Sequence, residues 1–163
     1  MNSLPLEVAV TLEPLFFVIS TFSIFNFCAS TLSSFVVVKS SGVIIENNNK
    51  GKKTVFICPC GPTEQYPILA RLVNDGNISL KNVWIINMDE YLTDDGKWVN
   101  PNDKFSFHNW MNTLFYDRVK PELVMPENQR IFPDPEHPEK VGEIIKELGG
   151  VDMVLGGIAL NGH

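Results

Sequence analysis

The sequence predicts an α/β fold: an open, mostly parallel sheet sandwiched between helices. Two observations lead to this prediction. Short apolar runs alternate along the chain with longer segments whose apolar residues recur at helical spacing. The short runs are apolar throughout rather than at every second position, which is typical of parallel strands buried on both faces.

The size and composition of the chain fit one domain with a hydrophobic core. Its 163 residues are 44% hydrophobic and 20% charged, which is typical of a globular chain. The formal net charge of −6 argues against a nucleic-acid partner, because a phosphate backbone requires a basic surface. A small anionic substrate is not excluded, since it needs only a locally positive pocket.

The three cysteines, Cys28, Cys58 and Cys60, predict neither a disulfide framework nor a metal site. Their number is odd, and no second pair of Cys or His residues accompanies Cys58 and Cys60. We therefore interpret the latter two as small buried thiols at the end of a strand, and we expect no metal.

The first fifty residues differ from the rest, and the sequence leaves their role open. Pro14 to Val38 carry no charge and are long enough to span a membrane, but their many hydroxyl residues make a poor span. No basic residue precedes the apolar run, which argues against a signal peptide. The alternatives are strand and helix material at the edge of the domain, or a segment not native to it. Because Ser40 to Lys53 is expected to be a polar linker or turn, we expect an atypical segment over 1–53 and the α/β domain over 54–163.

Regular alternation begins at Thr54. Thr54 to Pro59 is expected to be a strand, Gly61 to Thr63 a turn, Glu64 to Gly76 a helix and Asn82 to Met88 a second strand. The helix should bury one face, made of Tyr66, Leu69, Ala70 and Val73.

The pattern continues to the end of the chain. We expect a polar loop over Tyr91 to Asp103, a helix over Phe105 to Val119, a proline-rich connection over Pro121 to Pro138, a helix over Glu139 to Gly150 and a strand over Val151 to Ile158. The apolar faces of these two helices should consist of Phe107, Trp110, Met111, Leu114 and Phe115, and of Val141, Ile144, Ile145 and Leu148.

Three strand ends should meet at one edge of this sheet, where α/β folds bind ligands. The Gly61–Thr63 turn opens a helix and can hold an anion. Asp89, beside Glu90, can act as a general base, and His163 can transfer protons near neutral pH. Taken singly, each residue has a commoner structural explanation: a helix cap, a solvated strand end or an exposed histidine. Their shared edge favours the functional interpretation.

Two further histidines are not expected to take part. His108 lies in a predicted helix and His137 in the proline-rich connection. We interpret both as surface residues.

Two motifs stand at strand ends: "MDEY", Met88 to Tyr91, follows a buried strand, and "LGGIALNGH", Leu155 to His163, closes a later one. Together they resemble the glucosamine-6-phosphate deaminase (isomerase) family. The "GPT" turn falls where the family has its phosphate loop, and "SFHNWMNTLFYDRV" resembles the segment between the two motifs. The resemblance extends from about Val55 to His163, and the first fifty residues show none.

The resemblance implies a Rossmann-like sandwich and a cytoplasmic enzyme of amino-sugar and N-acetylglucosamine catabolism. Such an enzyme opens the ring of glucosamine 6-phosphate, isomerises it and releases ammonia to give fructose 6-phosphate, without redox cofactor or metal. Asp89 matches the base that moves the proton between carbons 2 and 1, His163 the residue that opens the ring, and Asn161 the position that orients it. The substrate-binding positions implied are Gly61 and Thr63, at the phosphate, and Glu90, which supports Asp89 by a hydrogen bond. A homo-oligomer is compatible with this resemblance.

This chain departs from the family pattern in the turn and at its end. Pro62 has no N–H to offer a phosphate, and Glu64 adds a negative charge nearby. The family continues past the "NGH" motif with a glutamate that partners the histidine and with basic phosphate ligands. We therefore expect a domain truncated at its C-terminal side and inactive or nearly so by itself.

Three alternatives stand beside the deaminase. A 6-phosphogluconolactonase has the same fold, but that family tends to carry Arg where this chain has Tyr91. A non-catalytic sugar-phosphate sensor would suit the altered turn. A membrane-tethered fragment depends on Pro14 to Val38 alone.

Overall fold

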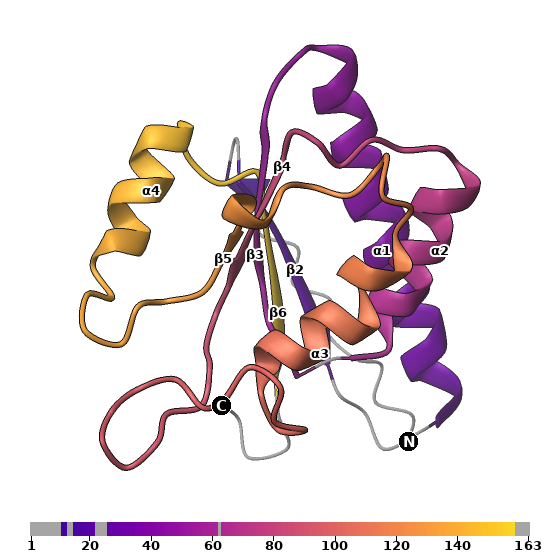
Figure 1. Cartoon of the computed structure of the whole chain (residues 1–163). Helices are drawn as coiled ribbons and strands as arrows, with labels where there is room; N and C mark the ends of the chain where they lie inside the picture. Colours follow the sequence, from indigo (N-terminus) through magenta and orange to yellow (C-terminus); the bar gives the residue numbers. More distant parts are fainter. Residues whose placement is uncertain (1–10, 13–14, 22–25, 62, 159–163) are drawn as a thin grey trace.

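The fold is built on one six-stranded sheet with helices on both sides (Figure 1). A computed structural model of the chain describes residues 11–12, 15–21, 26–61 and 63–158. The strands are β1 (Thr11–Leu12), β2 (Leu15–Thr21), β3 (Thr54–Cys58), β4 (Val83–Asn87), β5 (Arg130–Ile131) and β6 (Met153–Ile158). The helices are α1 (Asn26–Asn49), α2 (Gln65–Asp75), α3 (Phe107–Leu114) and α4 (Lys140–Leu148), with single 3-10 turns at Tyr116–Arg118 and Glu127–Gln129.

The strand order is β1-β2-β6-β3-β4-β5, and only the β1–β2 pair is antiparallel among the described strands. The predicted mostly parallel sheet is therefore confirmed. The chain moves outward from β3 through β4 to β5 and then returns to place β6 between β2 and β3. Since crossovers between parallel strands are right-handed, this return puts α4 on the face opposite to α1, α2 and α3 (Figure 1).

The two faces of the sheet are covered unequally. The sheet face under α1 and α2 is fully buried, and the predicted inner face of α2 packs in the same core. This core includes Phe56, Cys58, Ile85 and Met153 from the strands and Tyr66, Leu69, Ala70 and Val73 from α2. On the α4 side, Ile57, Trp84 and Val154 remain partly exposed. The four apolar residues predicted to face inward from α4 are likewise only half-buried.

The segment before β3 is helical almost to its end, so the predicted polar linker from Ser40 to Lys53 is wrong. Helix α1 continues to Asn49 because its polar side chains are satisfied where they are buried. The Ser40 hydroxyl donates to the Val36 carbonyl at 2.8 Å, and the Asn47 amide donates to Thr54 Oγ1 at 3.2 Å. Such bonds remove the cost of placing hydroxyl and amide groups inside the domain.

Of the alternatives for the first fifty residues, strand and helix material at the edge of the domain matches the structure. Strand β2 pairs with β6 and α1 packs against α2. Within the described ranges no helix combines the length and the hydrophobicity needed to cross a membrane. The expected division of the chain after residue 53 stays a prediction.

Most other predicted elements are confirmed, with two corrections. Strand β5 lies within the stretch expected to be only a connection, Pro121 to Pro138, and pairs with β4 through two residues. Helix α3 is shorter than predicted: it ends at Leu114 and gives way to a 3-10 turn. Of its predicted apolar face, Met111 and Phe115 are fully buried.

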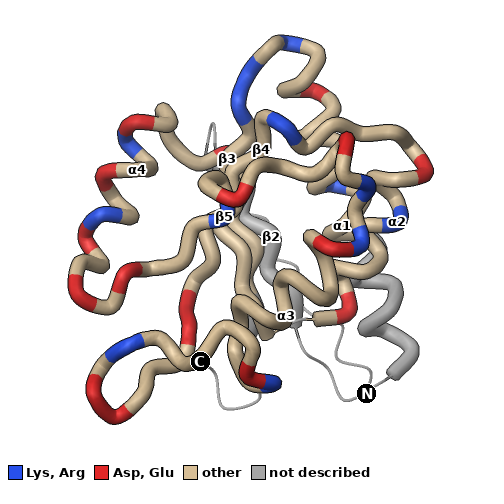
Figure 2. Tube along the Cα trace, in the orientation of Figure 1, with Lys and Arg blue, Asp and Glu red and all other residues tan. Residues whose placement is uncertain are grey.

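Charged residues are kept off the central strands. Strands β3, β4 and β6 contain none. Apart from Arg130 on β5, the described Lys, Arg, Asp and Glu residues lie on helices and connections (Figure 2). A carboxylate directly after β4 therefore stands at the boundary between an uncharged core and solvent.

Candidate active site at the carboxyl edge of the sheet

The ends of β3 and β4 lie side by side. Cys58 and Asn87, the last residues of the two strands, are paired in register, and the Met88 N–H donates to the Cys58 carbonyl at 3.0 Å. The segments that follow, with the Gly61–Thr63 turn and the Asp89–Glu90 pair, therefore leave the sheet at the same edge. This placement agrees with the sequence analysis.

The third predicted member of the site lies partly beyond the described residues. Strand β6 flanks β3 on the side away from β4 and ends at Ile158. Asn161 and His163 lie outside the described residues. Their predicted roles stay predictions.

Asn87 ties the end of β4 to both neighbouring strand ends. It is fully buried, and its amide nitrogen donates to the Ile131 carbonyl of β5 at 3.0 Å. Its amide oxygen accepts from the Cys60 thiol at 3.6 Å, just after β3. A buried side chain thus holds the backbone immediately before Asp89, a role that the sequence analysis missed.

Asp89 is exposed at the edge, yet its carboxyl group is perturbed. Partial burial raises the pKa of Asp89 above its ordinary value, and the adjacent charge of Glu90 raises it further. The charge of Asp89 in turn contributes to the raised pKa of the buried Cys60 thiol, so the carboxylate stands near the start of the β3 loop. A carboxylate with a raised pKa is better matched to proton transfer near neutral pH.

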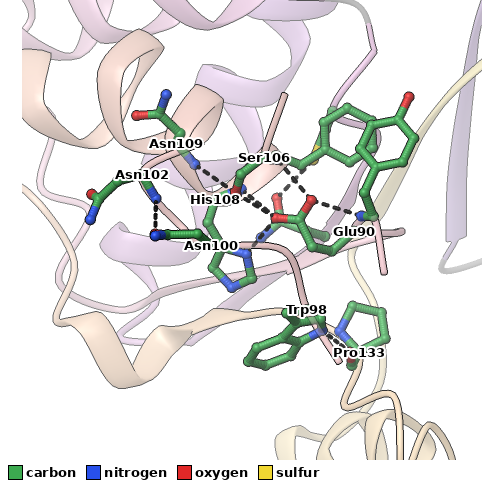
Figure 3. A network of polar contacts seen from close by, with 12 residues as sticks. Glu90, Trp98, Asn100, Asn102, Ser106, His108, Asn109 and Pro133 are labelled. Carbon is green, nitrogen blue, oxygen red and sulfur yellow. Dashed lines mark hydrogen bonds and ion pairs between the residues drawn. The ribbon is translucent and has the colours of Figure 1, made fainter. Parts of the chain in front are cut away.

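Glu90 differs from Asp89 in exposure, in hydrogen bonding and in the direction of its pKa shift. Its side chain is only 1% exposed and points to the N-terminus of α3 (Figure 3). Oε1 accepts from the Tyr91 and Phe107 N–H groups at 2.8 and 2.9 Å. Oε2 accepts from Ser106 Oγ, the His108 N–H and His108 Nδ1 at 2.8, 2.9 and 2.6 Å. Burial by itself raises the pKa of Glu90, but these hydrogen bonds outweigh it and hold the pKa below its ordinary value.

His108 is not a surface residue, which corrects the sequence analysis. Its side chain is 19% exposed, and its ring stacks on Phe132 with 3.6 Å between the ring centroids. The Trp98 ring lies beside it at 4.9 Å, and Trp98 Nε1 donates to the Pro133 carbonyl at 3.0 Å (Figure 3). The sequence offered no signal for this, because the partners are distant in the chain. His137 is exposed, as predicted.

The Gly61–Thr63 turn leads into α2 without a side-chain cap. Thr63 is half-buried, and its N–H donates to the Gly61 carbonyl at 2.9 Å, so that donor is occupied within the turn. Glu64 is exposed beside it. The Thr63 hydroxyl and the N-terminus of α2 therefore remain as the groups suited to an anion.

The two thiols near this edge are buried and chemically inert. Burial raises the pKa of Cys58 to about 12 and that of Cys60 as well. Across the described parts of the chain, no three His, Cys, Asp or Glu side chains are grouped so that they could hold a metal ion.

The arrangement brings together a perturbed carboxylate and a candidate anion-binding turn on two adjacent strand ends. Two buried polar side chains, Asn87 and Glu90, hold the backbone on either side of Asp89 by hydrogen bonds. A base held in this way can take a proton from a carbon beside a carbonyl and return it to a neighbouring carbon.

Known proteins of similar sequence are glucosamine-6-phosphate deaminases. No protein-family model matches the chain. The glucosamine-6-phosphate deaminase of Bacillus velezensis is 32% identical over 130 residues, which cover 77% of this chain and 52% of the relative. The predicted resemblance is therefore confirmed. The matched 77% of this chain is longer than the stretch from Val55 to His163, so the match must extend into the first fifty residues. The expectation that those residues show no resemblance is therefore wrong.

Solved structures agree on the fold. A monomeric glucosamine-6-phosphate deaminase superposes with a TM-score of 0.69 at 23% identity, covering 89% of this chain and 56% of that one. A 6-phosphogluconolactonase from Thermotoga maritima superposes with a TM-score of 0.51 at 18% identity, covering 81% and 53%. The predicted Rossmann-like α/β sandwich is thereby confirmed. The chain spans about half the length of each of these proteins.

Proposed function

We propose that this chain provides the general base of a glucosamine-6-phosphate deaminase reaction, with Asp89 as that base. The observation that carries the proposal is the raised pKa of Asp89 at the end of β4, beside the β3 turn, in a chain similar to known deaminases. The reaction class is ring opening, aldose–ketose isomerisation and hydrolytic release of ammonia, which yields fructose 6-phosphate.

The chemistry asks three things of the base, and Asp89 suits each. It must reach the proton on carbon 2, which the strand end supports by fixing its position. It must be ionised yet basic enough to remove that proton, which favours a raised pKa. It must then return the proton to carbon 1, which requires the same group to stay in place throughout.

The remaining roles complete the proposal. Thr63 and Gly61 bind the phosphate with the N-terminus of α2, while His163 opens the ring and Asn161 orients it. Pro62 and Glu64 weaken phosphate binding, so basic residues from elsewhere in the protein must contribute. We further propose a hydrolase of N-acetylglucosamine catabolism that acts in the cytoplasm on a small sugar phosphate, with a homo-oligomer as its assembly.

The test is turnover of glucosamine 6-phosphate by the protein encoded by the complete gene, measured as ammonia and fructose 6-phosphate. Asp89→Asn should lower kcat by roughly 10²- to 10⁴-fold, the usual contribution of a general base. Asp94→Asn, a change of the same kind in the exposed loop beyond, should have little effect. No turnover by the unaltered protein, or full turnover by Asp89→Asn, would refute the proposal.

A lactonase activity is the second candidate, since a 6-phosphogluconolactonase shares the fold. The same protein should be offered 6-phosphogluconolactone in parallel. Hydrolysis of the lactone without ammonia release from the amino sugar would replace the first proposal by the second.

A further inference from the structure

The buried carboxylate of Glu90 has no capacity left for a ligand. An ionised carboxylate offers about four lone-pair sites on its two oxygens. Five donors already point at them, all within 2.9 Å, and the side chain is 1% exposed. This geometry argues against Glu90 as a substrate-binding position. None of the five bonds comes from Asp89, so support for Asp89 has to pass through the backbone and not through the predicted hydrogen bond.

Four of the five donors to Glu90 come from the far end of the loop that begins at Tyr91. Ser106, Phe107 and His108 form the first turn of α3, so the carboxylate ties the end of β4 to that helix (Figure 3). An anion at a helix N-terminus is also favoured by the helix dipole.

His108 extends this connection to a third segment. Its ring donates to Glu90 through Nδ1 and stacks on Phe132, which follows β5. Trp98 covers the ring from another side and is itself bonded to Pro133. Glu90 and His108 therefore sit where β4, α3 and the chain after β5 converge.

We propose that Glu90 and His108 form a positioning pair that fixes the Asp89 carboxylate at the edge of the sheet. This inference rests on the proposed function in one respect, namely that Asp89 is the reacting group. Glu90 shares a peptide unit with Asp89, and the Tyr91 N–H on its other side is bound by its own carboxylate. The backbone on the C-terminal side of Asp89 cannot rotate without breaking these bonds, and Asn87 restrains the N-terminal side.

A pair that only capped α3 would affect stability, and only the charge of Glu90, acting through space, would reach Asp89. A positioning pair must also set the surroundings of the Asp89 carboxyl group. Its titration, followed by carbon-13 NMR of the carboxyl carbon, separates the two roles and requires neither substrate nor turnover.

We expect the Asp89 titration midpoint to lie above its ordinary value in the unaltered chain and to fall by about half a pH unit or more in His108→Leu, which keeps the charge of Glu90 and removes a bond that holds it. Glu90→Gln should lower the midpoint under either role, because it removes the neighbouring charge. His108→Asn, whose amide can replace the Nδ1 donor, should restore the midpoint. Ser106→Ala is the matched control. It removes one donor to Glu90 and the cap on the Asn109 N–H, so it should lower the Tm and leave the Asp89 midpoint in place.

An Asp89 midpoint that is ordinary in the unaltered chain, or unchanged in His108→Leu, would overturn the proposal and reduce the pair to a helix cap. In the complete enzyme, Glu90→Gln and His108→Leu should lower kcat about tenfold or more with KM little changed. If the midpoint shifts as expected but the enzyme releases no ammonia, the positioning pair stands and the proposed function fails.

Discussion

Replacing Asn87 with alanine should destabilise the fold by about 2–4 kcal/mol. The change removes the donor to the Ile131 carbonyl and the acceptor for the Cys60 thiol from a side chain with no solvent exposure. Leaving a buried polar partner unsatisfied costs about 1–3 kcal/mol. The cavity left by the amide adds about 1 kcal/mol, because surrounding side chains relax only partly.

The assay is urea unfolding followed by tryptophan fluorescence, since Trp84 lies on β4 itself. For a chain of this size each kcal/mol lowers the Tm by about 2–4 °C, so calorimetry should show a fall of roughly 5–15 °C. Asn87→Asp should be at least as harmful at pH 7, because an ionised carboxylate would then face the Ile131 carbonyl.

Asn112→Ala is the matched control, because Asn112 is exposed on α3 and alanine favours a helix. It should change stability by no more than about 0.5 kcal/mol. A loss of that size or less in Asn87→Ala would refute the reasoning that this amide holds three strand ends together.

Three further predictions concern the same edge and the helix on the opposite face. Asp89→Asn should leave the Tm at pH 7 unchanged or raise it. The pKa of Asp89 is higher in the folded state than in the unfolded state, so ionisation of this carboxyl group lowers the stability of the fold as pH rises. An amide does not ionise, so the variant does not lose this stability. Glu90→Gln should destabilise the chain at pH 7, and its deficit against the unaltered protein should shrink as pH falls below about 4.3, because a lowered folded-state pKa gives stability only above the unfolded value. Urea midpoints measured from pH 3 to 7 check both, and a deficit that stays constant with pH would contradict the second. Gly149→Ala should cost about 1 kcal/mol in urea unfolding, because Gly149 ends α4 with φ at +90°; the exposed Gly142, inside the same helix, is the control and should gain stability as alanine.

The central part of the fold could be predicted because its local signals agree. Strand β3, helix α2 and strand β4 each have an apolar pattern of the right period, and a glycine or proline stands near the ends of β3 and α2. Strand β5 could not be predicted. It is two residues long and exists only because the edge of β4 is available for pairing.

Helix α1 was missed for a different reason. Its sequence is rich in β-branched and hydroxyl residues and ends in a run of asparagines, which locally resembles a strand followed by a linker. The hydroxyl of Ser40 returns to the backbone of its own helix, and Asn47 bonds to Thr54. Such contacts are tertiary or depend on the helix already being present, so no local pattern reveals them.

The sequence pattern brings Asp89 and Glu90 to one edge of the sheet, but it is the resemblance to the deaminase family, and not the pattern, that assigns them different roles. Asp89 and Glu90 are adjacent and both acidic, and the end of a buried strand brings both to the edge of the sheet. Which one turns outward depends on the first turn of α3, which lies sixteen to eighteen residues further along the chain. Because His108 was interpreted as a surface residue, the sequence analysis did not identify it as the side chain that binds Glu90.

The bond between Glu90 and the start of α3 also closes residues 91–105 into a loop whose two ends are fixed. The exposed turn from Thr93 to Lys97 projects from this closed loop. Since lengthening a loop with fixed ends costs only about 0.6 kcal/mol for each doubling, insertions at that turn should be inexpensive and should not displace Asp89. The edge of this sheet thus offers a place where the chain can lengthen, in nature or by design, while the Asp89 carboxylate stays where it is.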